Sequence, residues 1–338
     1  MLSSRKFWNL AAIGGVIAAV ILASMVMFSR PVPPPPLPAV VDAAQAAARK
    51  DLPLPKLQRY VARDGAHLAY RSYPQGRTER PEAAVILVSG SGGSSVAMNT
   101  LGYALARAGL PAFAVDTRGQ GQSVGRSGTR GDIDYIGQLE DDLEDFVNVV
   151  RTDHPSTPLV LLGHSSGGGF ALRVAGGHAG MLFSRFVLLA PYLGPAAPTT
   201  RPNSGGWAHA AVPRIIALTV LDGVGIDAFN HLPVIAFALP PQKAGENTDD
   251  GLTRMWSYAM MRNFGPSDDI IGDAKKSRGP ITLLAGSNDE VMIADRYAEY
   301  FSAVKDKVKL SLLPGVTHIS ILNDPAAVVG VVGAVKGN

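Results

Sequence analysis

The segment Gly163-His164-Ser165-Ser166-Gly167 frames one serine with glycines two residues before and two residues after it. Such a frame is typical of a sharp turn from a strand into a helix, which exposes the serine Oγ while the glycines avoid Cβ clashes. The apolar run over residues 159–162 precedes this turn, and helical spacing begins at Gly167. The setting predicts that Ser165 is the nucleophile of an acyl-transfer reaction.

The same spacing occurs a second time, at Gly121-Gln122-Ser123-Val124-Gly125. In a chain with 37 glycines, chance alone yields about 0.3 matches, so the bare pattern is weak support. Ser123 lies several residues beyond the nearest predicted strand, in a polar stretch with no helical spacing after it. The strand–turn–helix context therefore selects Ser165.

A serine hydroxyl attacks only when a base removes its proton, and that base needs an orienting carboxylate. Of the seven histidines, only His318 follows the last predicted strand, residues 308–313. Asp289 follows the strand predicted over residues 281–285, and its neighbour Glu290 is the alternative acid. The order serine, acid, histidine is that of a nucleophile-elbow hydrolase. We therefore predict a catalytic triad of Ser165, Asp289 and His318.

Negative charge on the reacting carbonyl oxygen requires preorganised N–H groups. We expect one from the backbone of Ser166, directly after the nucleophile, and one from Ser91 in the glycine-rich loop 89–93. This loop could also be read as a phosphate cradle. It lacks the lysine and the glycine spacing of a P-loop, so we favour an oxyanion hole.

Short apolar runs alternate with helical patterns through most of the chain, which predicts a mostly parallel sheet covered by helices on both faces. A hairpin is expected first, over residues 58–73. Further strands are expected at residues 83–88, 111–115, 159–162, 186–190, 281–285 and 308–313, and helices at 98–108, 136–151, 167–175 and 296–304. The alternation stops between about 199 and 277, where we expect a separate, mostly helical insertion.

Composition narrows the function classes further. The chain has no cysteine, which rules out thiolate nucleophiles, disulfides and cysteine-ligated zinc. The net charge of +3 is scattered without a dense basic run, so we expect no nucleic-acid partner. We expect no cofactor and no metal.

The first fifty residues differ from the rest. Residues 7–28 are apolar apart from Asn9 and Ser24, and about 20 such residues form a transmembrane helix. A cleaved signal peptide is the alternative. Residues 31–52 read as a Pro/Ala-rich linker, and residues 53–338 as the hydrolase domain. Because two basic residues precede the apolar run and one follows it closely, we expect residues 1–30 to anchor an extracytoplasmic domain, periplasmic in a bacterium.

From about Leu57 onward, these motifs resemble the α/β-hydrolases of the monoacylglycerol lipase, lysophospholipase and serine aminopeptidase group. Residues 116–123, Asp-Thr-Arg-Gly-Gln-Gly-Gln-Ser, look like that group's D-x-R-G-x-G-x-S loop, which is structural and borders the active site. This accounts for the second match at Ser123. Two departures are Ser89-Gly90 in place of His-Gly, and Gly-His-Ser-Ser-Gly-Gly in place of Gly-His-Ser-Met-Gly.

The resemblance implies an α/β-hydrolase fold whose helical cap insertion shapes the substrate pocket. Apolar stretches at residues 212–221 and 232–241 of this cap indicate ordinary cap packing or, alternatively, an acyl-binding wall or a bilayer-facing entrance. An apolar cap on an anchored enzyme would suit a lipid-like ester substrate. The leading hypothesis is thus a membrane-anchored carboxylic-ester hydrolase. A peptidase or amidase with the same triad is one alternative, and a non-catalytic binding module with this fold is another.

Overall fold

A computed structural model of the chain describes residues 4–37, 52–74, 81–125, 128–240 and 251–337. Its main feature is an eight-stranded sheet with the order β1-β2-β4-β3-β5-β6-β10-β11. β1 and β2 form the predicted hairpin, β2 pairs antiparallel with β4, and all later pairs are parallel. The strands are β1 (Leu57–Val61), β2 (His67–Tyr73), β3 (Ala84–Val88), β4 (Ala112–Val115), β5 (Leu159–His164), β6 (Arg185–Leu189), β10 (Ile281–Gly286) and β11 (Val308–Leu313).

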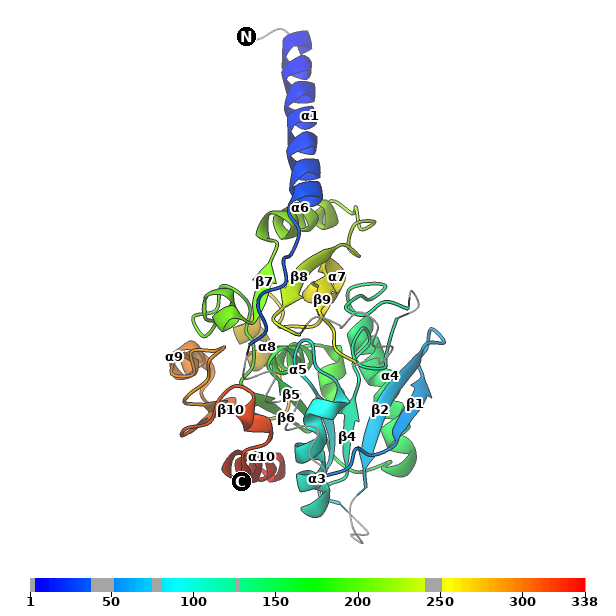
Figure 1. Cartoon of the computed structure of the whole chain (residues 1–338), viewed down its shortest axis with the longest axis vertical. Helices are drawn as coiled ribbons and strands as arrows, with labels where there is room; N and C mark the ends of the chain where they lie inside the picture. Colours follow the sequence, from blue (N-terminus) through cyan, green and yellow to red (C-terminus); the bar gives the residue numbers. More distant parts are fainter. Residues whose placement is uncertain (1–3, 38–51, 75–80, 126–127, 241–250, 338) are drawn as a thin grey trace.

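Helices cover both faces of this sheet (Figure 1). They include α3 (Asn99–Arg107), α4 (Gln138–Asp153), α5 (Ser166–Gly176), α8 (Ile270–Lys276), α9 (Arg296–Tyr300) and α10 (Pro325–Lys336). Short 3-10 turns complete the layers: η1 (Ser95–Met98), η2 (His178–Leu182), η4 (Ser302–Val304) and η5 (Ser320–Leu322). This arrangement is the mostly parallel α/β-hydrolase fold predicted from the sequence.

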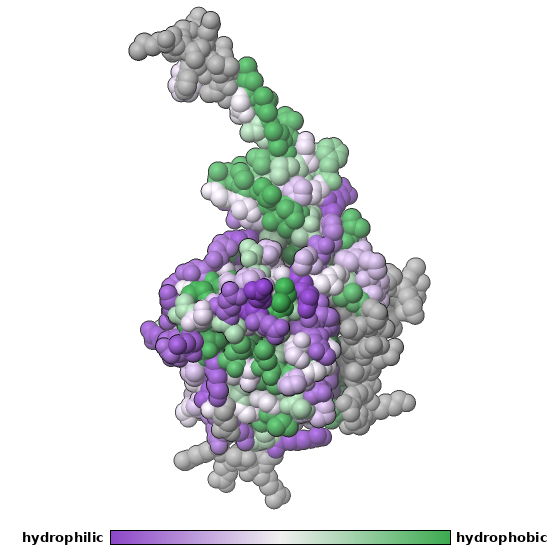
Figure 2. All heavy atoms as spheres, turned by 90° about the vertical axis from the view of Figure 1, so that its left-hand side faces the viewer, coloured by the Kyte–Doolittle hydropathy of each residue, from purple (hydrophilic) through white to green (hydrophobic). Residues whose placement is uncertain are grey.

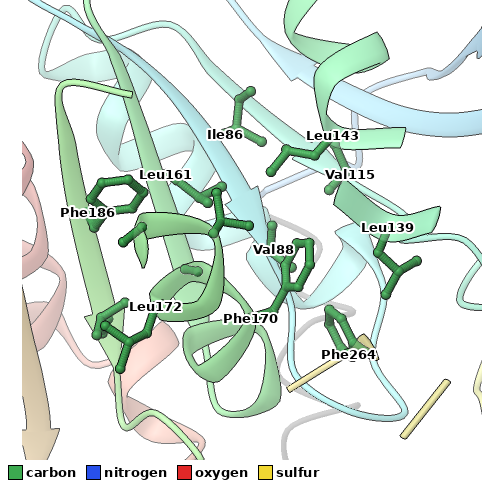
Figure 3. Packing of buried hydrophobic residues seen from close by; sticks show 14 of the residues in the cluster. Ile86, Val88, Val115, Leu139, Leu143, Leu161, Phe170, Leu172, Phe186 and Phe264 are labelled. Carbon is green, nitrogen blue, oxygen red and sulfur yellow. The ribbon is translucent and has the colours of Figure 1, made fainter. Parts of the chain in front are cut away.

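The strand residues explain the two helical layers. Every residue of β3 is buried, and successive side chains point to opposite faces. Ile86 and Val88 join the core that includes Leu143 of α4 and Phe170 of α5 (Figure 3), whereas Leu87 joins the core under α3 and α10. Two-sided burial is why this strand reads as a continuous apolar run.

The insertion between β6 and β10 differs from the expected helical cap. It contains a three-stranded antiparallel sheet, β7 (Ala208–Ala210), β8 (Pro233–Phe237) and β9 (Met255–Ser257). The other elements are η3 (Pro202–Gly206), α6 (Val212–Gly223) and α7 (Tyr258–Asn263), while residues 241–250 lie outside the described residues. Strands of three to five residues are too short to show a two-residue period in the sequence, and this hid the sheet.

The N-terminal helix α1 (Ser4–Phe28) projects from the cap and contacts α6 at its base (Figure 1). It includes residues 7–28, for which the sequence predicts a transmembrane helix. Within the described ranges, no helix combines the length and apolar character needed to cross a membrane. The chain then continues without regular secondary structure through residues 29–37, and the remainder of the expected linker, residues 38–51, is not among the described residues.

Candidate active site

The turn between β5 and α5 has the conformation that its glycines predict. Ser165 has φ 54° and ψ −120°, a strained region for a residue with a side chain. A Cβ atom on Gly163 would lie 2.0 Å from the Gly167 carbonyl oxygen, and one on Gly167 would lie 2.4 Å from the Ser89 carbonyl oxygen. Only glycine fits either position, so the frame holds Ser165 on a sharp turn at the end of the central strand.

His318 connects the serine to a carboxylate. Its Nε2 lies 3.0 Å from Ser165 Oγ, and its Nδ1 lies 2.8 Å from Asp289 Oδ2. All three side chains are buried. Residues separated by 153 positions in the chain thus meet because β5, β10 and β11 are near neighbours in the sheet.

The two adjacent carboxylates, Asp289 and Glu290, have different partners. Asp289 Oδ1 accepts hydrogen bonds from the backbone N–H groups of Val291 and Met292, at 2.8 and 2.6 Å. Glu290 Oε2 instead accepts the backbone N–H of His318 at 2.8 Å. The acid facing the imidazole is therefore Asp289, and Glu290 holds the histidine backbone.

Electrostatics favour an ionised Asp289. Burial acts to raise the pKa of Asp289, but the charge and hydrogen bond of His318 and the two N–H donors outweigh burial and leave this pKa below its ordinary value. Burial and the neighbouring His318 lower the pKa of His164 to about 3. Neutral His164 can donate from Nε2 to the His318 carbonyl oxygen, 2.9 Å away.

The predicted oxyanion loop lies against Ser165. A Cβ on Gly90 would be 2.9 Å from the Cβ of Ser165, so the backbone of this loop passes very close to the serine. The next residue, Ser91, lines the same cavity as Ser165 and His318. Its Oγ accepts a hydrogen bond of 2.9 Å from Trp207 Nε1 in the cap. Ser166 is the first residue of α5, where helix N–H groups lack intrahelical acceptors.

Ser123, in the second glycine frame, is surrounded by the groups that it holds together rather than by a cavity. It is fully buried, and its Oγ accepts the backbone N–H of Ala69 at 2.7 Å. Asp116 at the start of the same loop accepts N–H groups from Ser95 and Gln122. The loop thus connects β2, β4 and the segment after β3.

An apolar cavity of about 350 Å³ opens above the serine. Its walls come from the oxyanion loop, the cap and the loops around the triad, and they include Trp207, Leu239, Leu252, Val291, Ile319 and Leu322. Leu37, from the proline-rich segment, also lines it. Sequence reasoning missed Leu37 and Trp207, because neither residue belongs to a motif. No cluster of His, Asp or Glu suited to a metal ion occurs among the described residues.

The model of the family Hydrolase_4, described as serine aminopeptidase, S33, matches residues 79–326. The chain is 30% identical over 259 residues to a monoacylglycerol lipase of Mycolicibacterium smegmatis, and this alignment covers 72% of the chain and 84% of the relative. It is 31% identical over 144 residues to a monoglyceride lipase of Rattus norvegicus, covering 43% of the chain and 46% of that relative. The chain thus spans about half the length of the matched mammalian relatives.

Solved structures show the same fold. A soluble variant of monoglyceride lipase from Saccharomyces cerevisiae, in complex with a substrate analog, superposes with a TM-score of 0.62 at 20% identity, covering 86% of this chain and 96% of the other. The family match runs from before β3 into α10 and therefore includes the elbow, the acid loop and the histidine loop. The chain belongs to the Hydrolase_4 family, the S33 group of α/β-hydrolases.

Proposed function

We propose that this chain is a serine hydrolase that cleaves carboxylic esters of lipid-like acids through an acyl-enzyme on Ser165. The observation that carries this proposal is the position of His318. Its imidazole bridges Ser165 Oγ and the Asp289 carboxylate at the base of an apolar cavity. A serine so paired with a base and an orienting acid is an activated nucleophile.

In the proposed mechanism, Ser165 Oγ attacks the ester carbonyl carbon while His318 Nε2 takes the hydroxyl proton. The N–H groups of Ser91 and Ser166 would stabilise the resulting oxyanion. When the tetrahedral intermediate collapses, the carbon–oxygen bond of the ester breaks and the alcohol leaves with the proton from His318. A water molecule, deprotonated by His318, then attacks the acyl-enzyme and releases the carboxylic acid. Asp289 keeps the imidazole oriented and stabilises its charged form.

The cavity supports an apolar acyl group as the substrate. Half of its described lining residues have apolar side chains, and most of these come from the cap and the histidine loop. Burying a methylene group there contributes about 0.8 kcal/mol, so each added carbon of an acyl chain strengthens binding. Relatives named monoglyceride lipase and monoacylglycerol lipase make a lipid ester the natural candidate class.

The family description also includes aminopeptidase activity, so amide hydrolysis is the competing function. An aminopeptidase needs an acidic group to bind the substrate ammonium ion. Among the lining residues that the structure describes, Glu290 is the one with a carboxylate, and this carboxylate accepts the backbone N–H of His318. The described pocket therefore favours an ester with an uncharged acyl group over a peptide N-terminus.

A fluorophosphonate probe and a pair of chromogenic substrates test the proposal. We expect the wild-type chain to label and to hydrolyse p-nitrophenyl octanoate faster than an aminoacyl p-nitroanilide. S165A should lose labelling and about 10⁶-fold in kcat, whereas S123A, which changes the structural serine, should still label. If the wild-type chain did not label and hydrolysed no more ester than S165A, the protein would be a non-catalytic binding module. Turnover of the anilide alone would replace the esterase with an amidase.

We also propose that α1 attaches the enzyme to a membrane and that the catalytic domain lies outside the cytoplasm. Large apolar side chains of α1 are exposed along its described length, including Ile13, Val16, Ile17, Val20 and Ile21. Figure 2 shows this apolar surface continuing onto the upper cap. Attachment predicts that the full chain floats with phosphatidylcholine vesicles. A periplasm-active reporter fused after Leu57 should be active, and an inactive fusion would place the domain in the cytoplasm.

A further inference from the structure

The proline-rich segment between α1 and the catalytic domain reads as a spacer in the sequence, yet the structure shows it bound to the cap. In residues 31–37, Pro-Val-Pro-Pro-Pro-Pro-Leu, only Val32 and Leu37 have a backbone N–H. Both N–H groups donate to the cap. Val32 N–H donates to His209 Nδ1 at 3.0 Å, and Leu37 N–H donates to the Ala238 carbonyl oxygen at 3.3 Å. The segment therefore satisfies all its backbone donors on one surface.

The four prolines between these contacts explain how the segment keeps an extended conformation. A proline run favours the extended polyproline helix, which has a rise of about 3.1 Å per residue and few alternative conformations. The five steps from Val32 to Leu37 then span about 15 Å. A stiff segment fixed at both ends loses little entropy when it lies on the cap. Its last described residue, Leu37, is consequently held in one place.

That place is the wall of the substrate cavity. Leu37 is half-buried and lines the cavity that contains Ser165 and His318. Its Cδ2 atom is 3.8 Å from the position that a Cβ would occupy on Gly206, directly before Trp207. Among the described residues, the rest of the lining comes from the catalytic domain and its cap, so Leu37 is the part of the wall that the N-terminal segment contributes.

The same segment is connected to the oxyanion loop by consecutive hydrogen bonds. The Ala238 carbonyl accepts the N–H of Leu37, while the Ala238 N–H donates to the Trp207 carbonyl oxygen at 2.8 Å. The indole Nε1 of Trp207 then donates to Ser91 Oγ at 2.9 Å. Ala238, which accepts the N–H of Leu37, thus also positions Trp207, and the Trp207 indole holds Ser91 of the predicted oxyanion loop.

We propose that the segment 31–37 fixes Leu37 in the wall of the acyl-binding cavity and that Leu37 is a specificity-determining residue for the length of the acyl group. This inference rests on the proposed esterase function and adds a determinant outside the hydrolase domain. Leu37 acts by shape: its side chain contributes apolar surface to a bound acyl chain and limits the space available to a longer one.

The first test changes the size of the side chain in the full-length protein. L37W should lower the ratio of kcat/KM for p-nitrophenyl octanoate to kcat/KM for p-nitrophenyl acetate by about tenfold, the lower end of what filling an apolar pocket costs. V32W is the matched control, because the Val32 side chain is 62% exposed and lies outside the cavity lining. It should leave that ratio unchanged. An unchanged ratio in L37W would overturn the proposal.

A second test does not require turnover, because the natural chain contains no cysteine. L37C and V32C each introduce one thiol, which a methanethiosulfonate reagent can label. Octanoate, the product acid, should slow labelling in L37C and have no effect in V32C. If wild type failed to hydrolyse esters but octanoate still protected L37C, the place of Leu37 in the cavity wall would be supported and the esterase function would be rejected. Ester hydrolysis without protection in L37C would reject the wall and keep the esterase.

Discussion

Two neighbouring carboxylates show how much the candidate active site depends on side-chain direction. Asp289 and Glu290 carry the same functional group one residue apart, and the sequence alone leaves both as candidate acids. In the structure Asp289 contacts the imidazole Nδ1 and two backbone N–H groups, while Glu290 contacts the backbone of His318. The first can select the tautomer of His318, and the second can only position its main chain.

Amide substitutions separate these two roles. D289N should lower kcat by about 10⁴-fold, because a neutral amide neither stabilises the imidazolium nor maintains the correct tautomer. E290Q keeps an oxygen acceptor for the His318 N–H and should lower kcat by less than about tenfold. Steady-state kinetics with p-nitrophenyl octanoate measure both variants, and circular dichroism checks their folding. A larger loss in E290Q than in D289N would exchange the assigned roles.

His164 predicts a specific loss of stability in acid. Its folded pKa of about 3 lies below the unfolded value of 6.5, so the unfolded chain binds more protons between these two pH values. The free energy of unfolding therefore falls as the pH drops through 6.5. From pH 7 to pH 5, this residue should remove about 2 kcal/mol. Urea unfolding should show that difference between wild type and H164Q, and equal pH slopes in both proteins would contradict it.

At the scale of elements, the cap holds the oxyanion loop through Trp207. This indole belongs to the residue directly before β7 and donates to Ser91 Oγ, so the cap and the predicted oxyanion loop share a hydrogen bond. Trp256 in β9 provides a contrast within the same sheet. Its Nε1 is buried and has no hydrogen-bond partner in the described part of the chain.

Phenylalanine at each position tests this link. W207F removes the donor to Ser91 and should lower kcat up to about tenfold, the value of one neutral hydrogen bond, with a smaller change in KM. W256F makes the same chemical change without removing a hydrogen bond and should leave kcat nearly unchanged. Stopped assays over a range of ester concentrations separate kcat from KM. Equal losses in the two variants would mean that packing of the cap, rather than the Ser91 contact, sets the rate.

Elements with a strong local signal were predictable from the sequence. The elbow at Ser165 follows a fully buried strand, and the clash that Gly163 avoids, with the Gly167 carbonyl, depends only on local backbone geometry. The short strands of the cap sheet and the seat of Leu37 were not predictable. Both depend on contacts across more than twenty residues, such as Leu37 with Ala238, and leave no period or motif in the chain.

For the whole molecule, the junction between α1 and the cap sets how the cap is oriented relative to α1. The Arg214 side chain of α6 donates from Nε to the Val26 carbonyl at 2.8 Å and from Nη1 to the Pro233 carbonyl at 2.9 Å. Val26 also packs beside Leu218 and Tyr258. Apolar side chains of α6, Val212, Ile216 and Val220, are exposed at four-residue intervals near this junction. Membrane attachment through α1 would thus bring one face of the cap towards the lipid.

Replacing Arg214 should separate membrane attachment from the orientation of the cap. R214M removes two hydrogen bonds from a buried guanidinium and should lower the free energy of unfolding by about 2–3 kcal/mol. Because α1 itself is unchanged, the variant should still float with phosphatidylcholine vesicles. Hydrolysis of water-soluble p-nitrophenyl acetate should stay near the wild-type rate, since Arg214 is outside the described cavity lining. Hydrolysis of a monoacylglycerol dispersed in those vesicles should fall, because a loosened cap no longer keeps the cavity at a fixed position relative to α1.

The control R296M removes an exposed ion pair with Glu299 and should change neither rate. If R214M hydrolysed the vesicle-borne ester as fast as wild type, the junction would serve stability alone.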